Sequence, residues 1–94
     1  MTDINEIKSK ITPILKAAGA RRASIFGSYA RGQQNEKSDV DILIELPEGL
    51  SLFDFIEIQQ NLEAALRKKV DLVEYKAIKP LLKKYILKDV MPVL

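Results

Sequence analysis

The sequence predicts a single α/β domain over residues 1–94, in which helices and strands alternate along the chain. Three observations predict this class. Apolar residues recur at helical spacing in several segments, short β-branched runs lie between those segments, and Gly or Pro marks many of the boundaries. Ninety-four residues, 47% of them apolar, are enough to fill one core of modest size without disulfides.

The expected order of elements is α-β-α-β-α-β-α. Helices are expected at residues 4–18, 28–31, 52–66 and 80–89, and strands at 22–26, 39–46 and 70–75. In the first helix, Asp3 is the expected N-cap and Gly19 follows the last turn, where a C-terminal cap belongs. Pro13 is expected to kink this helix or to remove one of its hydrogen bonds.

The long third helix has clear signals at both ends. Ser51 is its expected N-cap with Asp54 at the N3 position, and the cations at 67–69 complement the negative end of the helix dipole. Its buried face is expected to comprise Leu52, Phe55, Ile56, Leu62, Ala65 and Leu66. In the last helix the residues expected to point inward are Leu81, Leu82, Tyr85 and Ile86.

Several classes of function are excluded by composition. The chain has no cysteine and no histidine, which excludes disulfides, thiolate zinc sites and any catalysis that needs histidine. A proton acceptor must therefore be a carboxylate or water. No apolar run approaches the ~20 residues of a membrane span, and the N-terminus lacks the apolar region of a signal peptide. A cytoplasmic protein is expected, and a net charge of +2 gives no indication of nucleic-acid binding.

The most informative segment is Gly27-Ser28 followed, after ten residues, by Asp39-Val40-Asp41. In a strand, residues i and i+2 point to the same face, so the two aspartates would hold their carboxylates side by side. Carboxylates that close repel each other, and a hard divalent cation relieves the repulsion. A glycine turn that leads into a helix offers backbone N–H groups to phosphate. Together these features indicate nucleotide chemistry.

The segments FGSYARG at 26–32 and SDVDI at 38–42 resemble the signature of the DNA polymerase beta-like nucleotidyltransferases. The Gly-Ser-x-Ala-Arg-Gly form and the short length are similar to the minimal nucleotidyltransferase family, whose members are antitoxins often encoded beside a HEPN-domain ribonuclease toxin. This resemblance implies a small mixed sheet, with the helices packed mainly on one face and the catalytic acids on the other.

A third acid is expected on the strand that follows the long helix, where the family places one. Asp71 is the candidate, because an aspartate inside a strand of Val and Leu is tolerated best when it is paired or bound to metal. Glu74 is the competing choice, but the two-residue period of a strand places it on the opposite face from Asp71.

The resemblance assigns roles to these residues. Gly27 and Ser28 would hold the β- and γ-phosphates of ATP, Asp39 and Asp41 would bind two Mg²⁺ ions, and Asp71 would complete the metal site nearest the acceptor. Arg31 is either a phosphate ligand, a partner of a catalytic acid, or an ordinary surface arginine. These roles imply AMP transfer to a hydroxyl, expected to be a tyrosine of the HEPN partner.

Two other functions are left open by the sequence. The chain could be an antitoxin that inhibits by binding alone, although retention of all three acids favours an enzyme. It could also be an aminoglycoside-type nucleotidyltransferase, but no acceptor domain is expected in 94 residues. The last helix and the apolar tail at 91–94 are expected to form part of a protein interface, with packing of the tail on its own core as the alternative. The lysines around that helix are expected to form a solvated face.

Overall fold

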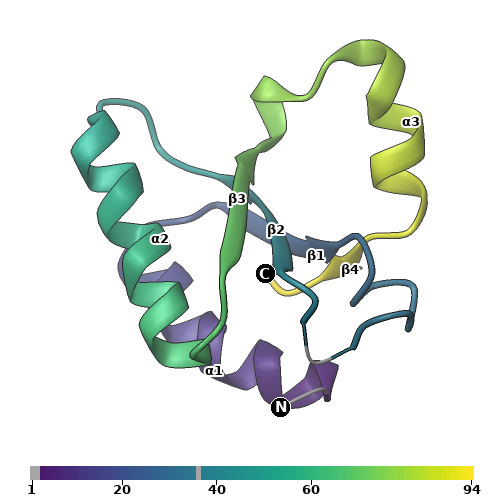
Figure 1. Ribbon diagram of the computed structural model, residues 1–94. Helices are drawn as coiled ribbons and strands as arrows, with labels where there is room; N and C mark the ends of the chain where they lie inside the picture. Colours follow the sequence, from purple (N-terminus) through teal and green to yellow (C-terminus); the bar gives the residue numbers. More distant parts are fainter. Residues whose placement is uncertain (1–2, 36) are drawn as a thin grey trace.

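The computed structural model describes residues 3–35 and 37–94, and its centre is a four-stranded sheet with two long helices on one side (Figure 1). The helices are α1 (Ile4–Ala17), α2 (Leu52–Leu66) and α3 (Pro80–Lys88), with one 3-10 turn, η1 (Tyr75–Ala77). The strands are β1 (Arg22–Phe26), β2 (Val40–Glu45), β3 (Val70–Glu74) and β4 (Met91–Pro92). Their spatial order is β3-β2-β1-β4, in which only β2 and β3 are parallel. The mixed sheet implied by the resemblance is confirmed.

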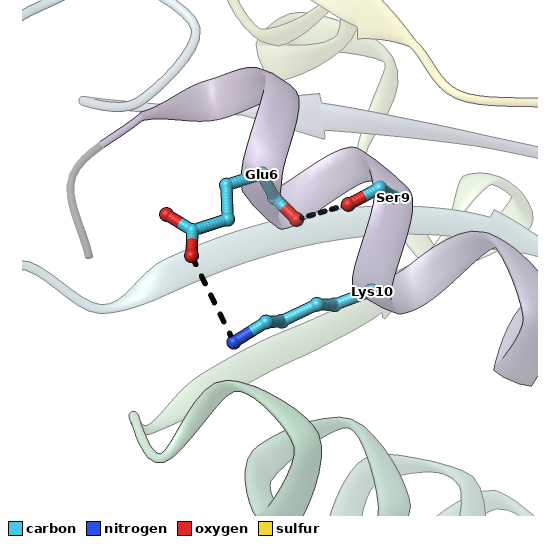
Figure 2. A network of polar contacts seen from close by, with 3 residues as sticks. All are labelled: Glu6, Ser9 and Lys10. Carbon is cyan, nitrogen blue, oxygen red and sulfur yellow. Dashed lines mark hydrogen bonds and ion pairs between the residues drawn. The ribbon is translucent and has the colours of Figure 1, made fainter.

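Helix α1 begins and ends as its sequence predicts. The Asp3 carboxylate accepts a hydrogen bond from the Asn5 amide at 2.9 Å, and Gly19 follows the C-cap in a left-handed conformation with φ +78°. The helix continues through Pro13, which is exposed. On the outer face, Figure 2 shows Lys10 4.0 Å from the Glu6 carboxylate and the Ser9 hydroxyl donating to the Glu6 carbonyl oxygen at 2.8 Å. These exposed contacts each contribute well under 1 kcal/mol, so the buried face holds the helix in place.

Helix α2 confirms its predicted N-terminus and corrects part of its predicted buried face. Ser51 and Asp54 form a capping box, in which each side chain accepts a hydrogen bond from the other residue's amide. Leu52 is 70% exposed and Ile56 is 38% exposed, so neither belongs to the core. Ile58, which is not among the residues expected on this face, is buried instead. The two exposed residues lie near the N-terminal end of α2, whose buried residues Ile58, Leu62 and Leu66 follow further along the helix.

The core lies between the sheet and the pair α1 and α2. The sheet contributes one face of each strand, and the two helices contribute their apolar stripes. The buried residues that form it are Ile7, Ile11, Leu15, Ala23, Ile25, Tyr29, Val40, Ile42, Ile44, Ile58, Leu62, Leu66, Val70 and Leu72. Because side chains alternate along a strand, Asp41 and Asp71 point away from this core.

The opposite face of the sheet is partly covered by η1. Tyr75 lies across it, donates a hydrogen bond from its hydroxyl to the Ser24 hydroxyl at 2.7 Å, and stacks under the Arg22 guanidinium at 3.9 Å. Arg22 also pairs with Glu45 on the neighbouring strand, at 3.5 Å. This arrangement shields one end of the face, including the fully buried Leu43, and leaves the end with Asp41 open.

Two predictions about the C-terminal segment are wrong in part. Helix α3 has no buried residue, so the side chains expected to point inward do not pack on the core, and Tyr85 is 77% exposed. The tail, in contrast, packs on its own core: β4 pairs with β1, and Val93 and Leu94 contact the buried cluster. The Val93 amide donates to the Ala23 carbonyl oxygen at 2.8 Å. The alternative for the tail is therefore confirmed, and of the two segments expected to form an interface, α3 is the one that stays exposed.

Candidate active site

The parallel pairing of β2 and β3 places two of the three predicted acids side by side. Asp41 is in register with Asp71, and the neighbouring pairs are Val40 with Val70 and Ile42 with Leu72. The apolar neighbours fix the register because they are buried in the core, and a slip of one residue would turn them toward solvent. Asp41 and Asp71 therefore share the face of the sheet that is opposite α1 and α2.

Gly27 lies directly against Asp41 and has no room for a side chain. Its φ is +72°, and a Cβ atom placed on it would come within 3.1 Å of the Asp41 Cγ and closer still to a carboxylate oxygen. Position 27 therefore requires glycine for two reasons: the positive φ of its backbone and its close contact with Asp41. This contact joins the two halves of the sequence signature into one site.

The segment after Gly27, expected to be a helix of one to two turns over 28–31, is a single turn. The Arg31 amide donates to the Gly27 carbonyl oxygen at 3.1 Å, as in the first turn of a helix. Gly32 then adopts φ +71°, and the Gln33 amide donates to the Ser28 carbonyl oxygen at 2.8 Å, the bonding pattern that ends helices. The glycine at position 32 therefore stops the helix after one turn. This turn offers individual backbone N–H groups to an anion rather than a helix dipole, because one turn has little dipole of its own.

The charge of Asp41 is destabilised by its surroundings. Burial, together with the charges of Asp71 and Asp39, raises the pKa of Asp41 from 3.8 to about 6, and the nearby Arg31 guanidinium opposes this shift. Arg31 itself donates from Nε to the Gln33 side-chain oxygen at 3.2 Å on the protein surface. A cation bound beside a half-buried carboxylate and two further carboxylates relieves their repulsion and stabilises their charges, so this environment favours cation binding.

A hollow of about 400 Å³ adjoins Asp39 and carries several cations. Its lining residues are Lys37, Ser38, Asp39, Leu66, Arg67, Lys68 and Lys69. From the sequence, the cations at 67–69 are expected only to complement the helix dipole at the end of α2. The parallel pairing of β2 and β3 also brings them beside the segment that leads into β2. In the sequence these cations stand directly before the strand that carries Asp71, and this position next to a candidate acid indicates that they lie near the site. A cluster of cations of this kind raises the local concentration of anions at the surface.

The donor set at this face consists of hard carboxylate oxygens, which are the ligands that Mg²⁺ prefers. Within residues 3–35 and 37–94, no three acidic, histidine or cysteine side chains form a preassembled metal-binding group. The structure thus brings Asp41 and Asp71 into register and places Asp39 where its charge acts on Asp41. Tyr29, which follows the glycine–serine turn, is buried in the core and does not face this site.

A mixed sheet with carboxylates on its open face, beside a Gly-Ser turn, is the arrangement of a small nucleotidyltransferase. Residues 8–92 match the nucleotidyltransferase domain family, and the chain belongs to that family. It is 54% identical over 92 residues to a Methanocaldococcus jannaschii protein that is provisionally named a protein adenylyltransferase, covering 98% of this chain and 99% of that one.

Two further relatives connect the fold with a named function. The protein adenylyltransferase MntA of Thermococcus cleftensis is 41% identical over 95 residues, covering 97% of this chain and 96% of that protein. A chain in the crystal structure of a toxin–antitoxin pair with AMP-PNP superposes with a TM-score of 0.80 and 27% identity, covering 93% of this chain and 72% of that chain. The family membership and fold expected from the sequence are confirmed. In the part of the chain that the structure describes, no helix has the length and apolar character needed to span a bilayer.

Proposed function

We propose that this chain is a Mg²⁺-dependent protein adenylyltransferase, which transfers AMP from ATP to a tyrosine hydroxyl of a HEPN-domain toxin and thereby acts as its antitoxin. The observation that carries the proposal is the in-register pair Asp41 and Asp71 beside Gly27 on the open face of the sheet. Relatives that cover almost the whole chain at 41% and 54% identity carry the name protein adenylyltransferase. The similar chain solved with AMP-PNP comes from a toxin–antitoxin pair.

The reaction forms one bond and breaks one. The acceptor oxygen attacks the α-phosphorus of ATP, the bond from that phosphorus to the bridging oxygen breaks, and pyrophosphate leaves with the electron pair. The hydroxyl proton has to go to a carboxylate or to water, because the chain has no histidine. Asp71 is suited to accept it, since its carboxylate is exposed and lies next to Asp41 in the sheet.

Each part of the site has a distinct role in this reaction. Backbone N–H groups of the turn at Gly27 and Ser28 bind the β- and γ-phosphates, and the lack of a side chain at Gly27 keeps the Asp41 carboxylate close to that turn. Arg31 and the cations at 67–69 attract the triphosphate. Two Mg²⁺ ions, when bound, would neutralise the triphosphate and lower the pKa of the attacking hydroxyl. Asp39, Asp41 and Asp71 are the residues that would hold them, and the raised pKa of Asp41 fits a carboxylate whose charge a bound cation would stabilise.

AMP on the toxin provides the antitoxin effect in this proposal. A nucleotide attached near a ribonuclease site adds bulk and negative charge, and both oppose the binding of RNA, which is itself a polyanion. The chain would then act catalytically, so a small amount of it could silence a larger amount of toxin.

The test uses the purified chain, a HEPN-domain protein from the same genome, Mg²⁺, and ATP labelled on either the α- or the γ-phosphate. AMP transfer predicts that the HEPN protein retains the α-label and not the γ-label, and that peptide mass spectrometry finds the modification on a tyrosine. Asp41→Asn should abolish labelling, whereas Asp89→Asn, an exposed aspartate at the end of α3, should not. Suppression of RNA cleavage without any label on the toxin would contradict the proposal and indicate inhibition by binding alone.

A further inference from the structure

Helix α3 exposes the apolar side chains that a helix of this kind normally buries. Leu81 is 87% exposed, Tyr85 is 77% exposed and Leu82 is 51% exposed. Leu81 and Tyr85 are four residues apart and so lie on the same side of the helix. With Pro80, Lys84 and Lys88 they line a shallow hollow of about 410 Å³. Apolar side chains that gather on an exposed surface often mark a protein contact.

The charge around this stripe has one sign. Lysines occupy positions 76, 79, 83, 84 and 88, and no Asp or Glu occurs between residues 75 and 88. The chain as a whole has 15 basic and 13 acidic residues, so this segment is strongly biased against a nearly balanced background. A surface of Leu and Tyr surrounded by lysines is complementary to an apolar patch with an acidic rim.

The position of α3 connects this surface with the catalytic face. The chain crosses the open face of the sheet at Tyr75, whose hydroxyl donates to Ser24, before it enters α3, and it returns through β4 beside β1. Figure 1 shows α3 standing apart from α1 and α2, on the other side of the sheet. The acids Asp41 and Asp71 face that same side. A protein that brings a hydroxyl to these acids therefore approaches from the side on which α3 stands.

We propose that α3 is the docking surface for the acceptor protein: its Leu81, Leu82 and Tyr85 side chains enter an apolar groove of the acceptor, and its lysines pair with an acidic rim around that groove. This inference rests on the proposed function, because it takes the occupant to be the protein that receives AMP. The surface sets the affinity and orientation of the acceptor, whereas the carboxylates carry out the transfer. Loss of the surface should therefore raise the KM for the acceptor and leave ATP binding unchanged.

Two pairs of substitutions test the surface. Leu81→Ser with Tyr85→Ser removes the apolar contact, and Lys84→Glu with Lys88→Glu reverses the charge. The matched control is Leu52→Ser with Phe53→Ser in the first turn of α2, where the side chains are 70% and 81% exposed. All of these positions are exposed, so each variant is expected to keep the fold, and thermal melts by circular dichroism check that it does.

Binding to the HEPN-domain protein is measured by calorimetry in the Asp41→Asn background, so that no turnover intervenes, and the acceptor KM is measured in the active chain. Each α3 pair should weaken binding by roughly ten-fold or more, which corresponds to about 1.4 kcal/mol. The control should change it less than about two-fold. Added salt should weaken wild-type binding more than binding of the lysine variant, because exposed charge pairs are screened.

The outcomes separate this inference from the proposed function. Binding through α3 without AMP transfer would refute the adenylyltransferase and support the docking surface. AMP transfer with an unchanged acceptor KM in both α3 variants would support the enzyme and overturn the docking surface. Failure of the wild-type chain to bind would overturn both. If the α3 variants instead lose binding to anionic phospholipid vesicles or to RNA while they keep their affinity for the HEPN protein, α3 serves a different ligand and the inference is wrong.

Discussion

Replacement of Asp41 by Asn is expected to abolish AMP transfer and, at the same time, to stabilise the metal-free protein. The wild-type carboxylate is half-buried and lies near Asp71 and Asp39, and its pKa is raised from 3.8 to about 6. The amide of Asn has nearly the same shape and carries no charge. It therefore removes the repulsion and most of the desolvation cost without leaving a cavity.

The size of the effect follows from the pKa. A rise of about 2 units corresponds to at most about 3 kcal/mol, at 1.36 kcal/mol per unit. Solvent screens a partly exposed group, so roughly 1 to 2 kcal/mol is expected to remain. For a domain of this length, each kcal/mol moves the melting temperature by about 4 to 8 °C. The variant should melt roughly 4 to 16 °C higher than wild type at pH 7.5 in the presence of a chelator.

The pH dependence provides the sharper test. Because the pKa of Asp41 is higher in the folded than in the unfolded protein, the folded state binds more protons between pH 4 and 6. The stability of wild type relative to the variant is thus greatest below about pH 4 and is lost as the pH rises through about 6. The advantage of Asp41→Asn should be absent near pH 4 and complete above pH 7, whereas Asp89→Asn should change little throughout. A variant less stable than wild type at pH 7.5, or an effect independent of pH, would refute the electrostatic reasoning.

Three further predictions follow from single contacts. Gly27→Ala should cost about 1 to 2 kcal/mol of stability, because its φ is +72°, and should abolish AMP labelling, because the new Cβ displaces the Asp41 carboxylate; unchanged melting and labelling would contradict the contact. Deletion of residues 91–94 should lower stability by about 3 kcal/mol, since the tail packs on the core; a monomer with an unchanged melting temperature would show otherwise. Tyr75→Phe should lower the free energy of unfolding by about 1 to 2 kcal/mol in a denaturant titration, because the Ser24 hydroxyl loses its donor. A denaturation midpoint equal to that of wild type would show that this hydrogen bond does not contribute to stability.

The sequence alone is sufficient to identify the parts of the fold that depend on local chemistry. Caps at Asp3, Ser51 and Gly19 depend on a few neighbouring residues, and all three lie where the sequence places them. Strands β1, β2 and β3 are found for the same reason, since alternation of apolar residues needs no knowledge of partners, whereas β4 was expected only as an apolar tail. The short helical segment expected at 28–31 is a single turn, because Gly32 ends it there.

The family could be named from two short motifs, because their spacing encodes a contact that the structure makes between Gly27 and Asp41. The expectation that Asp71 belongs with Asp41 needed the resemblance, and the parallel register of β2 and β3 agrees with it. The sequence also predicts that Asp39 and Asp41 share a face. It does not reveal that burial and like charges raise the pKa of Asp41, since both depend on neighbours distant in the chain.

Only the tertiary structure decided which apolar segments are buried. An amphipathic helix and a short apolar tail look alike in sequence whether they cover their own core or another protein, because periodicity records which residues share a face and not what that face meets. Here the edge of the sheet at β1 is free to pair with another strand, and the tail pairs with it as β4. The core was already closed by α1 and α2, so α3 has nothing to pack against and keeps its leucines and its tyrosine in water.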